Sequence, residues 1–230
     1  MTDWTVRGGF PAIFLLVGCL EPDPVAVGEQ AQFLGDGAGG FPSCGFGGGG
    51  APIVPCKCVG TSNDLTIDSS NPNDGDVSDP TCWVDGSPEM SCLLRWDISA
   101  IPTNATVTGA DLTVSVVDGS LANYSGQRII RPWTEAGATW VNSKGSTTWA
   151  TAGAKAATDR SPTTLFTFSG YSGVQITTLN SSGLAAVQGW VNSPISNQGV
   201  VISSADTHRM GISSKEGASA PRLCVSYTTP

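Results

Sequence analysis

The sequence is poor in basic residues and in long apolar runs, and each shortage excludes a class of protein. Only 11 of the 230 residues are Lys or Arg against 19 Asp or Glu, which gives a net charge of -8. A chain this acidic has no sequence-independent way to neutralise a phosphate backbone, so nucleic acid is not expected as a partner. The longest apolar stretch, residues 10–18, is far below the roughly 18 to 20 residues that a bilayer-spanning helix needs. No transmembrane span is predicted.

Signatures of common catalytic sites are also missing. The single histidine, His208, has no nucleophile-elbow motif to accompany it. The glycine-rich residues 37–50 lack the Lys-Ser/Thr ending of a phosphate-binding loop. We therefore predict that the protein is not an enzyme and has no catalytic residues. The alternative is a glycoside-acting enzyme, for which two carboxylates would have to converge in space from among Asp97, Glu135, Asp159, Asp206 and Glu216.

Cysteine, by contrast, is abundant, with seven residues, and the first of them has a context of its own. Residues 16–19, Leu-Val-Gly-Cys, resemble a bacterial lipobox, which implies cleavage before Cys19 and lipidation of that residue. We predict a lipoprotein signal peptide over residues 1–18 and a location in the bacterial cell envelope, with the lipid on Cys19 as the only membrane contact. Ordinary secretion is the alternative, because Asp3 offsets Arg7 in the segment before the apolar run.

An even number of cysteines remains once Cys19 is set aside: Cys44, Cys56, Cys58, Cys82, Cys92 and Cys224. In an exported chain this predicts disulfides. Cys82 and Cys92 are the expected pair, because residues 85–88, Asp-Gly-Ser-Pro, are a strong turn signal that would bring two flanking strands together. The pairing of the others stays open. No cysteine metal site is predicted, because Cys56-Lys57-Cys58 lacks the two-residue spacing of zinc ligands.

The composition changes along the chain. Residues 19–60 are rich in Gly and Pro and predict a lipidated cysteine followed by a flexible, disordered linker. From residue 61 onward short strands alternate with turn residues; in residues 92–98, for example, every second side chain is apolar. One helix is predicted over residues 182–191, behind serine caps. The predicted fold is all-β: an antiparallel jelly-roll-like β-sandwich with one short helix, over residues 61–230.

Several blocks within residues 61–230 resemble the DNRLRE-domain family in order and spacing. They are residues 93–102 with 105–112, residues 133–135 with 138–140, residues 187–192 leading into 197–202, and residues 213–216 with 220–223. The resemblance implies a jelly-roll-like sandwich in exported bacterial proteins, similar to carbohydrate-binding modules, some of which bind alginate. It implies no catalytic residues.

Two groups of residues are candidates for ligand binding. Trp133, Trp140 and Trp149 lie in a polar stretch without apolar alternation, so we expect an exposed ring there on which a sugar can stack, whereas Trp96 and Trp190 lie on apolar faces and are expected in the core. The alternative is that the three tryptophans pack over one open end of the sandwich. Bases that could hold a carboxylate of an acidic glycan are Arg128, Arg131, Arg209 and Lys215, unless they are scattered solvated charges.

The charge distribution leaves the ligand open. Residues 61–100 hold eight acids against Arg95 alone, whereas residues 101–230 hold six acids and eight bases. Residues 68–76 are acidic enough to suggest calcium, but they do not fit an EF-hand loop, and Asx turns are the expected alternative; no cofactor is predicted. We predict a non-catalytic cell-surface lipoprotein that binds a polysaccharide, acidic or neutral. The alternative is a structural or adhesive surface protein that binds protein partners.

Overall fold

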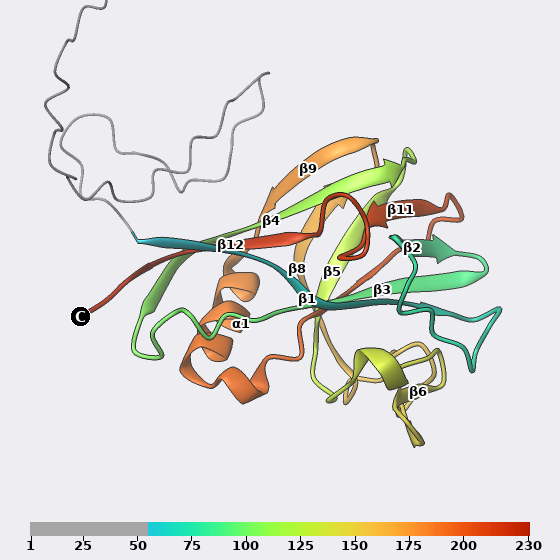
Figure 1. Cartoon of the computed structure of the whole chain (residues 1–230), viewed down its shortest axis with the longest axis horizontal. Helices are drawn as coiled ribbons and strands as arrows, with labels where there is room; N and C mark the ends of the chain where they lie inside the picture. The colour runs from blue at the N-terminus through green and yellow to red at the C-terminus, as the bar shows by residue number, and fades with distance from the viewer. Residues whose placement is uncertain (1–54) are drawn as a thin grey trace, which may run out of the picture. The chain divides into compact units, whose positions relative to one another are not determined.

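The computed structural model describes residues 55–230, which form two facing antiparallel sheets and one α-helix (Figure 1). This confirms the all-β prediction. The predicted signal peptide, Cys19 and the linker up to residue 54 lie outside the described residues. The strands are β1 (Cys56–Asp68), β2 (Thr81–Gly86), β3 (Glu89–Trp96), β4 (Thr106–Asp118), β5 (Asn123–Ile129), β6 (Asn142–Lys144), β7 (Thr147–Thr148), β8 (Arg160–Ser169), β9 (Gly173–Thr178), β10 (Val200–Ser203), β11 (Met210–Ser213) and β12 (Arg222–Thr228).

Two layers of strands make up the sandwich. In sheet A, β4 pairs with β12 and β11 on one side and with β9 on the other, while β2 pairs with β11. In sheet B, β3 lies between β1 and β10, followed by β5 and β8. All of these pairings are antiparallel, as the short connections and turn residues predicted.

The first strand belongs to both sheets. Residues 56–60 of β1 pair with β12 in sheet A, and the rest of the strand pairs with β3 in sheet B after an irregularity between Thr61 and Asn63. The sheet therefore begins at Cys56, so residues 56–60 belong to the folded domain and not to the predicted linker. Cys58 lies opposite Cys224 in β12 and forms a disulfide with it, and Cys56 is also disulfide-bonded. The Cys58–Cys224 bond holds the start of the domain to its last strand.

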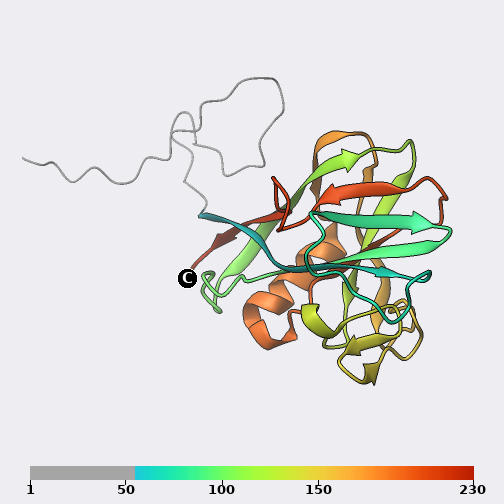
Figure 2. The same cartoon turned by 45° about the vertical axis from the view of Figure 1, so that its right-hand side comes forward.

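The central core fills the space between the two sheets. The apolar face predicted for residues 92–98 lies in this core, including the buried Trp96, and the Cys82–Cys92 disulfide joins β2 to β3 as predicted. The helix α1 (Ser181–Asn192) packs against β4 and β8 and buries Trp190 in the same core (Figure 2). Among residues 55–230, no helix is long and apolar enough to cross a membrane.

A second core lies on the outer face of sheet B. Residues 130–159, here called the covering segment, join β5 to β8 and fold back over this face; they include the 3-10 turn η1 (Glu135–Gly137), β6 and β7. The strands of sheet B present apolar side chains to the covering segment, and its tryptophans pack against them. We call this cluster the tryptophan core: Leu65, Ile67, Leu93, Ile129, Trp133, Ala138, Trp140, Trp149, Ala154 and Val201.

The expectation of an exposed tryptophan ring is therefore wrong. Trp133, Trp140 and Trp149 are only 2%, 8% and 3% exposed, and they cover a sheet face and not an open end of the sandwich. The physical reason is that sheet B is apolar on both faces, so its outer face must be buried as well. None of the three rings is free to stack on a sugar.

Candidate functional site

The predicted bases are dispersed over the molecule. Arg131 forms an ion pair of 2.5 Å with Asp159, whose side chain is fully buried. Burial raises the pKa of Asp159, but hydrogen bonds from the backbone of Ala150 and Thr151 and from Arg131 outweigh it, so that the pKa is lowered. This pair joins the two ends of the covering segment. Arg131 therefore has a structural partner instead of a free guanidinium.

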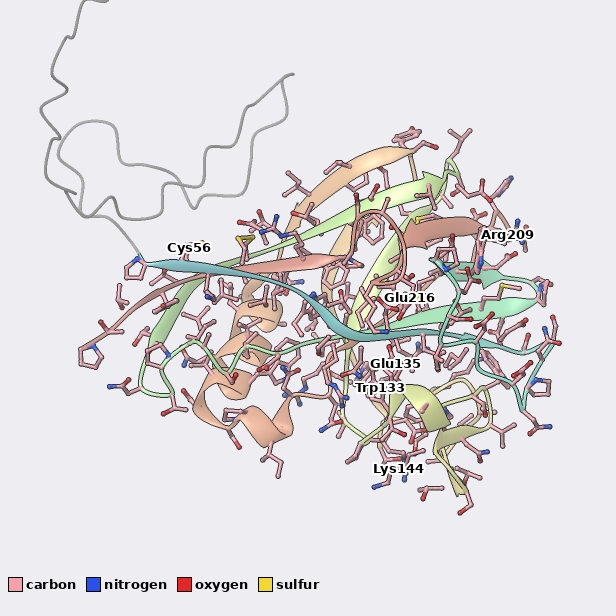
Figure 3. All side chains as sticks on the ribbon, viewed as in Figure 1. Cys56, Trp133, Glu135, Lys144, Arg209 and Glu216 are labelled. Carbon is pink, nitrogen blue, oxygen red and sulfur yellow. A yellow bond between two sulfur atoms is a disulfide. The ribbon has the colours of Figure 1, made fainter. Side chains whose placement is uncertain are left out.

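Two other predicted arginines lie elsewhere. The guanidinium of Arg209 is 4.1 Å from the ring centroid of Trp83 on sheet A and 3.6 Å from a carboxylate oxygen of Asp118. Arg128 lies in β5 opposite Val200 of β10. Figure 3 shows Arg209 well apart from Trp133 and Glu135. The candidate bases are therefore not gathered into one anion-binding site, and the alternative of scattered charges describes their placement better.

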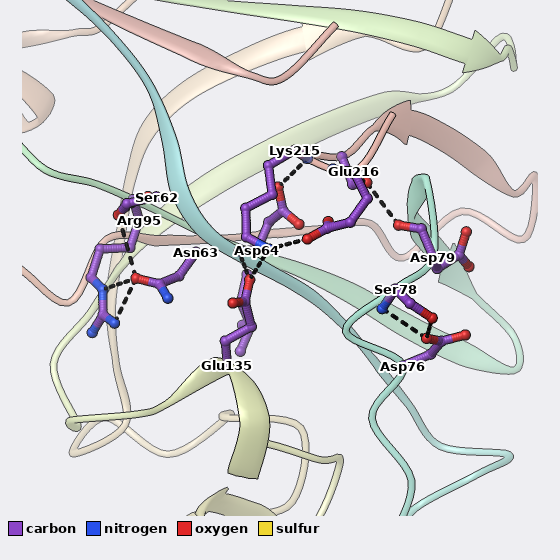
Figure 4. A network of polar contacts seen from close by, with 12 residues as sticks. Ser62, Asn63, Asp64, Asp76, Ser78, Asp79, Arg95, Glu135, Lys215 and Glu216 are labelled. Atoms are coloured by element: carbon purple, nitrogen blue, oxygen red, sulfur yellow. Dashed lines mark hydrogen bonds and ion pairs between the residues drawn. The ribbon is translucent and has the colours of Figure 1, made fainter. Parts of the chain in front are cut away.

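Lys215 belongs to a compact cluster of charges beside β1 (Figure 4). Its ammonium is 3.0 Å from a carboxylate oxygen of Glu135 and also pairs with Glu216. Its backbone N–H donates to Asp64 at 2.7 Å, and the backbone N–H of Asp64 donates to Glu135 at 2.8 Å. These contacts tie the β11–β12 loop and η1 to the edge strand of sheet B.

Asp64 is the buried member of this cluster. Burial raises its pKa from 3.8 to about 7; the hydrogen bond from Lys215 lowers it, and the neighbouring charge of Glu216 raises it further. Side-chain oxygens of Asp64, Glu135 and Glu216 lie within 4.8 Å of one another, close enough to share a cation. The ammonium of Lys215 already supplies that positive charge to two of them, so the geometry has a structural explanation.

The carboxylates considered for glycoside cleavage meet only in part. Glu135 and Glu216 come together, but both pair with Lys215. Asp97 accepts from the backbone of Ser99, Asp159 is buried, and Asp206 pairs with the exposed His208. In the acidic run of residues 68–76, the Asp68 carboxylate accepts from the backbone N–H of Ser70 at 2.7 Å, as in the Asx turns expected there.

A pocket of about 310 Å³ lies at the end of β3, next to this cluster. Polar and apolar groups contribute about equally to its wall, and Ile195, which is 89% exposed, lies at its rim. The lining residues are Ser62, Arg95, Trp96, Asp97, Ile98, Ser99, Pro194, Ile195, Asn197 and Gln198. A volume near the lower end of the roughly 300 to 1,000 Å³ of small-molecule sites suits one or two sugar units.

Arg95 is the one basic residue in the lining of this pocket. Its guanidinium lies 5.0 Å from the ring centroid of Trp133. It donates to the side-chain oxygen of Asn63 at 3.1 and 2.8 Å, to the backbone oxygen of Trp133 at 3.3 Å and to the side-chain oxygen of Gln198 at 3.5 Å. All three acceptors are neutral, and none of the ion pairs within residues 55–230 includes Arg95.

The pocket wall is rigidly built. Asn197 donates to the backbone oxygen of Trp96 at 2.8 Å and accepts from Gly199 at 3.0 Å, while Trp133 donates to the backbone oxygen of Gln198 at 2.8 Å. Gly199 has a φ of 73°, and a side chain there would collide with the backbone of Leu94. Residues 197–199 are thus fixed against the end of β3.

Sequence reasoning missed Arg95 as a site residue. Its one signal was its isolation as the only base among residues 61–100. Asn63 and Gln198 reach it from β1 and from the segment before β10, so its surroundings depend on long-range strand pairing. Of the predicted site residues, only Trp133 lies next to it, and as a buried support for the guanidinium.

No protein-family model matches the chain, and neither does any curated protein. The resemblance to the DNRLRE-domain family therefore stays a prediction.

Proposed function

We propose that the protein is a non-catalytic polysaccharide-binding protein and that one sugar unit of the polysaccharide occupies the Arg95 pocket. The observation that supports this most directly is Arg95 itself: a half-buried guanidinium that lines an open pocket and donates only to neutral acceptors. The lining also includes the amides of Asn197 and Gln198 and the hydroxyls of Ser62 and Ser99, which suit sugar hydroxyls, and Ile195 offers an apolar surface for a ring face. The resemblance to a carbohydrate-binding family is in keeping with this proposal.

An acidic polysaccharide is the proposed ligand class. A guanidinium has donors in a planar fork that matches a carboxylate, and such charge-assisted hydrogen bonds are stronger than neutral ones. The pocket also contains Asp97, whose pKa is lowered by hydrogen bonds from Ser99. A sugar carboxylate would therefore have to approach from the Arg95 side of the pocket.

The proposed location is the bacterial cell envelope, with a lipid on Cys19. The disulfides Cys58–Cys224 and Cys82–Cys92 support an oxidising compartment, where such bonds persist.

The test is binding of the full chain to soluble polysaccharides in affinity gels, with a polyuronate and a neutral glucan as ligands. Arg95→Gln should weaken retention by the polyuronate by about tenfold, because a charge-assisted hydrogen bond is worth roughly 1.5 to 3 kcal/mol. The matched control is Arg209→Gln, which removes the same charge beside Trp83 of sheet A and should leave retention unchanged. Equal losses in both variants, or no retention of the unmodified protein by either polymer, would refute the proposal.

One observation favours the alternative of a protein partner. Val174 and Ile176 in β9 and Val117 in β4 form an exposed apolar row at the edge of sheet A, and Val174 is 66% exposed. Apolar rows of this kind occur at protein interfaces. A protein-binding role predicts that Val174→Thr abolishes partner binding and that Arg95→Gln does not affect it.

A further inference from the structure

We infer that Asn63 determines the charge selectivity of the Arg95 pocket. Its neutral amide holds the guanidinium in place without neutralising it, so the positive charge of Arg95 is available to an anionic group of the ligand. This inference rests on the proposed binding function and names the residue that selects among its ligands. Asn63 lies in β1, where it pairs with Arg95 in β3.

The contact between the two side chains is a forked one. One oxygen of Asn63 accepts from Nε of Arg95 at 3.1 Å and from Nη2 at 2.8 Å. This is the edge of the guanidinium that a carboxylate usually takes in a two-point ion pair. An aspartate in this position would have the same shape and would give Arg95 an internal counter-ion. The amide gives the same orientation and leaves the positive charge unpaired.

A second feature of the structure preserves that charge. Glu135 is near enough to Arg95 to oppose the effect of burial on the pKa of the guanidinium. However, its carboxylate accepts from the backbone N–H of Asp64 and pairs with Lys215 at 3.0 Å. The nearest acid of the covering segment is therefore already engaged. Asn63 and Lys215 together keep a cation available in a protein whose overall charge is -8.

The consequence is a preference for acidic over neutral ligands that depends on the side chain of Asn63. A ligand carboxylate can bind the remaining N–H groups of Arg95 and recovers a full ionic interaction in a partly desolvated pocket. A neutral sugar gains only ordinary hydrogen bonds there. Replacing Asn63 by Asp should remove the preference while conserving the pocket, because Asp and Asn are nearly isosteric.

The experiment uses the full chain with the Nε–H signal of Arg95 as the probe, followed by NMR during titration with D-glucuronate, inorganic sulfate and D-glucose. In the unmodified protein, glucuronate should shift this signal saturably and glucose should have a much smaller effect. Asn63→Asp should raise the apparent Kd for glucuronate about tenfold or more, with no loss of thermal stability. Sulfate distinguishes selection of a planar carboxylate from selection of any anion.

The matched control is Asn104→Asp, which makes the same exchange at an exposed position outside the pocket lining. It should change the apparent Kd less than about threefold, because exposed charges are screened by solvent. Similar losses in both variants, unchanged binding in Asn63→Asp, or no response of the unmodified protein to any anion would each overturn the inference. The polysaccharide gels decide the proposed function separately: retention without an Arg95 response refutes only the role of Asn63, and a response without retention refutes only polysaccharide binding.

Discussion

Asp64 joins segments that are distant in sequence, at a cost in folding free energy that depends on pH. Its buried carboxylate receives the backbone N–H of Lys215, and its own N–H donates to Glu135. The carboxylate has two like charges beside it and only one lysine to balance them. Its charged form is therefore disfavoured near neutral pH, and burial is the largest cause.

Replacing Asp64 by Asn should make the protein more stable at pH 8 and less dependent on pH. The folded protein binds a proton at Asp64 up to a pKa of about 7, whereas the unfolded chain releases it near 3.8. The stabilising effect of that proton is fully present below pH 3.8 and is lost as the pH rises through 7. The loss is on the order of 4 kcal/mol. Asn keeps an acceptor for the Lys215 N–H and has no charge to bury.

Denaturant unfolding of the two proteins at pH 4.5, 6 and 8 measures this effect. The free energies of unfolding should converge at pH 4.5 and separate at pH 8, with the variant higher. Glu89→Gln removes an exposed carboxylate that pairs with Lys155 and is the control, with little expected change. A variant that is less stable than the original protein at pH 8 would show that the Asp64 charge is favourable.

The burial of a residue could be predicted from the sequence only where the pattern of its own strand determined it. Alternation within residues 92–98 placed Leu94 and Trp96 in the core, and the structure confirms it. Burial of Trp133 could not be predicted from the polar stretch around it, because the apolar surface that it covers comes from strands far away in sequence. A signal did exist: Leu93 and Val201 make their strands apolar on both faces, which is typical of a sheet covered on both sides.

Among the elements, α1 shows how a local signal gave the right helix and the wrong cap. The predicted range of residues 182–191 agrees closely with the observed Ser181–Asn192. The cap is Asn180 and not a serine: its side-chain oxygen accepts from Gly183 N at 3.0 Å, and its amide donates to the backbone oxygen of Thr164 at 2.8 Å. That second bond links the helix to β8, and only the folded arrangement provides it.

Asn180→Ala should destabilise the protein by about 1 to 2 kcal/mol, because the variant loses both the cap and the link to β8. For a domain of this size the melting temperature should fall by about 2 to 8 °C, at roughly 2 to 4 °C per kcal/mol. Ser181→Ala, at the first helical position, is the control and should change the free energy of unfolding by less than about 0.5 kcal/mol. Thermal unfolding followed by circular dichroism measures both. Equal effects would contradict the assignment of Asn180 as the cap.

At the scale of the whole molecule, sheet B separates two cores with different tasks. The central core holds the sheets together, and the tryptophan core holds the covering segment, whose Trp133 supports Arg95. Adjacent residues of β3 face opposite ways: Leu94 points into the central core and Leu93 into the tryptophan core, and both are fully buried. The fold class could be predicted from strand patterns, whereas the second core and the pocket depend on how residues 130–159 return to the sheet.

Leu93→Ala and Leu94→Ala form a matched pair that tests this division. Each removes the same side chain from a buried site and should cost about 2 to 5 kcal/mol. Leu93→Ala should loosen the covering segment in particular, so that hydrogen exchange accelerates in residues 130–159 while β4 and β12 stay protected. It should also weaken polyuronate binding, because Trp133 loses support beneath Arg95. Leu94→Ala should accelerate exchange in both sheets, with a smaller effect on binding at temperatures where the variant remains folded. Exchange that rises equally in residues 130–159 for both variants would mean that the two cores unfold as one unit, and the pocket would then depend on the whole sandwich instead of on its covering segment.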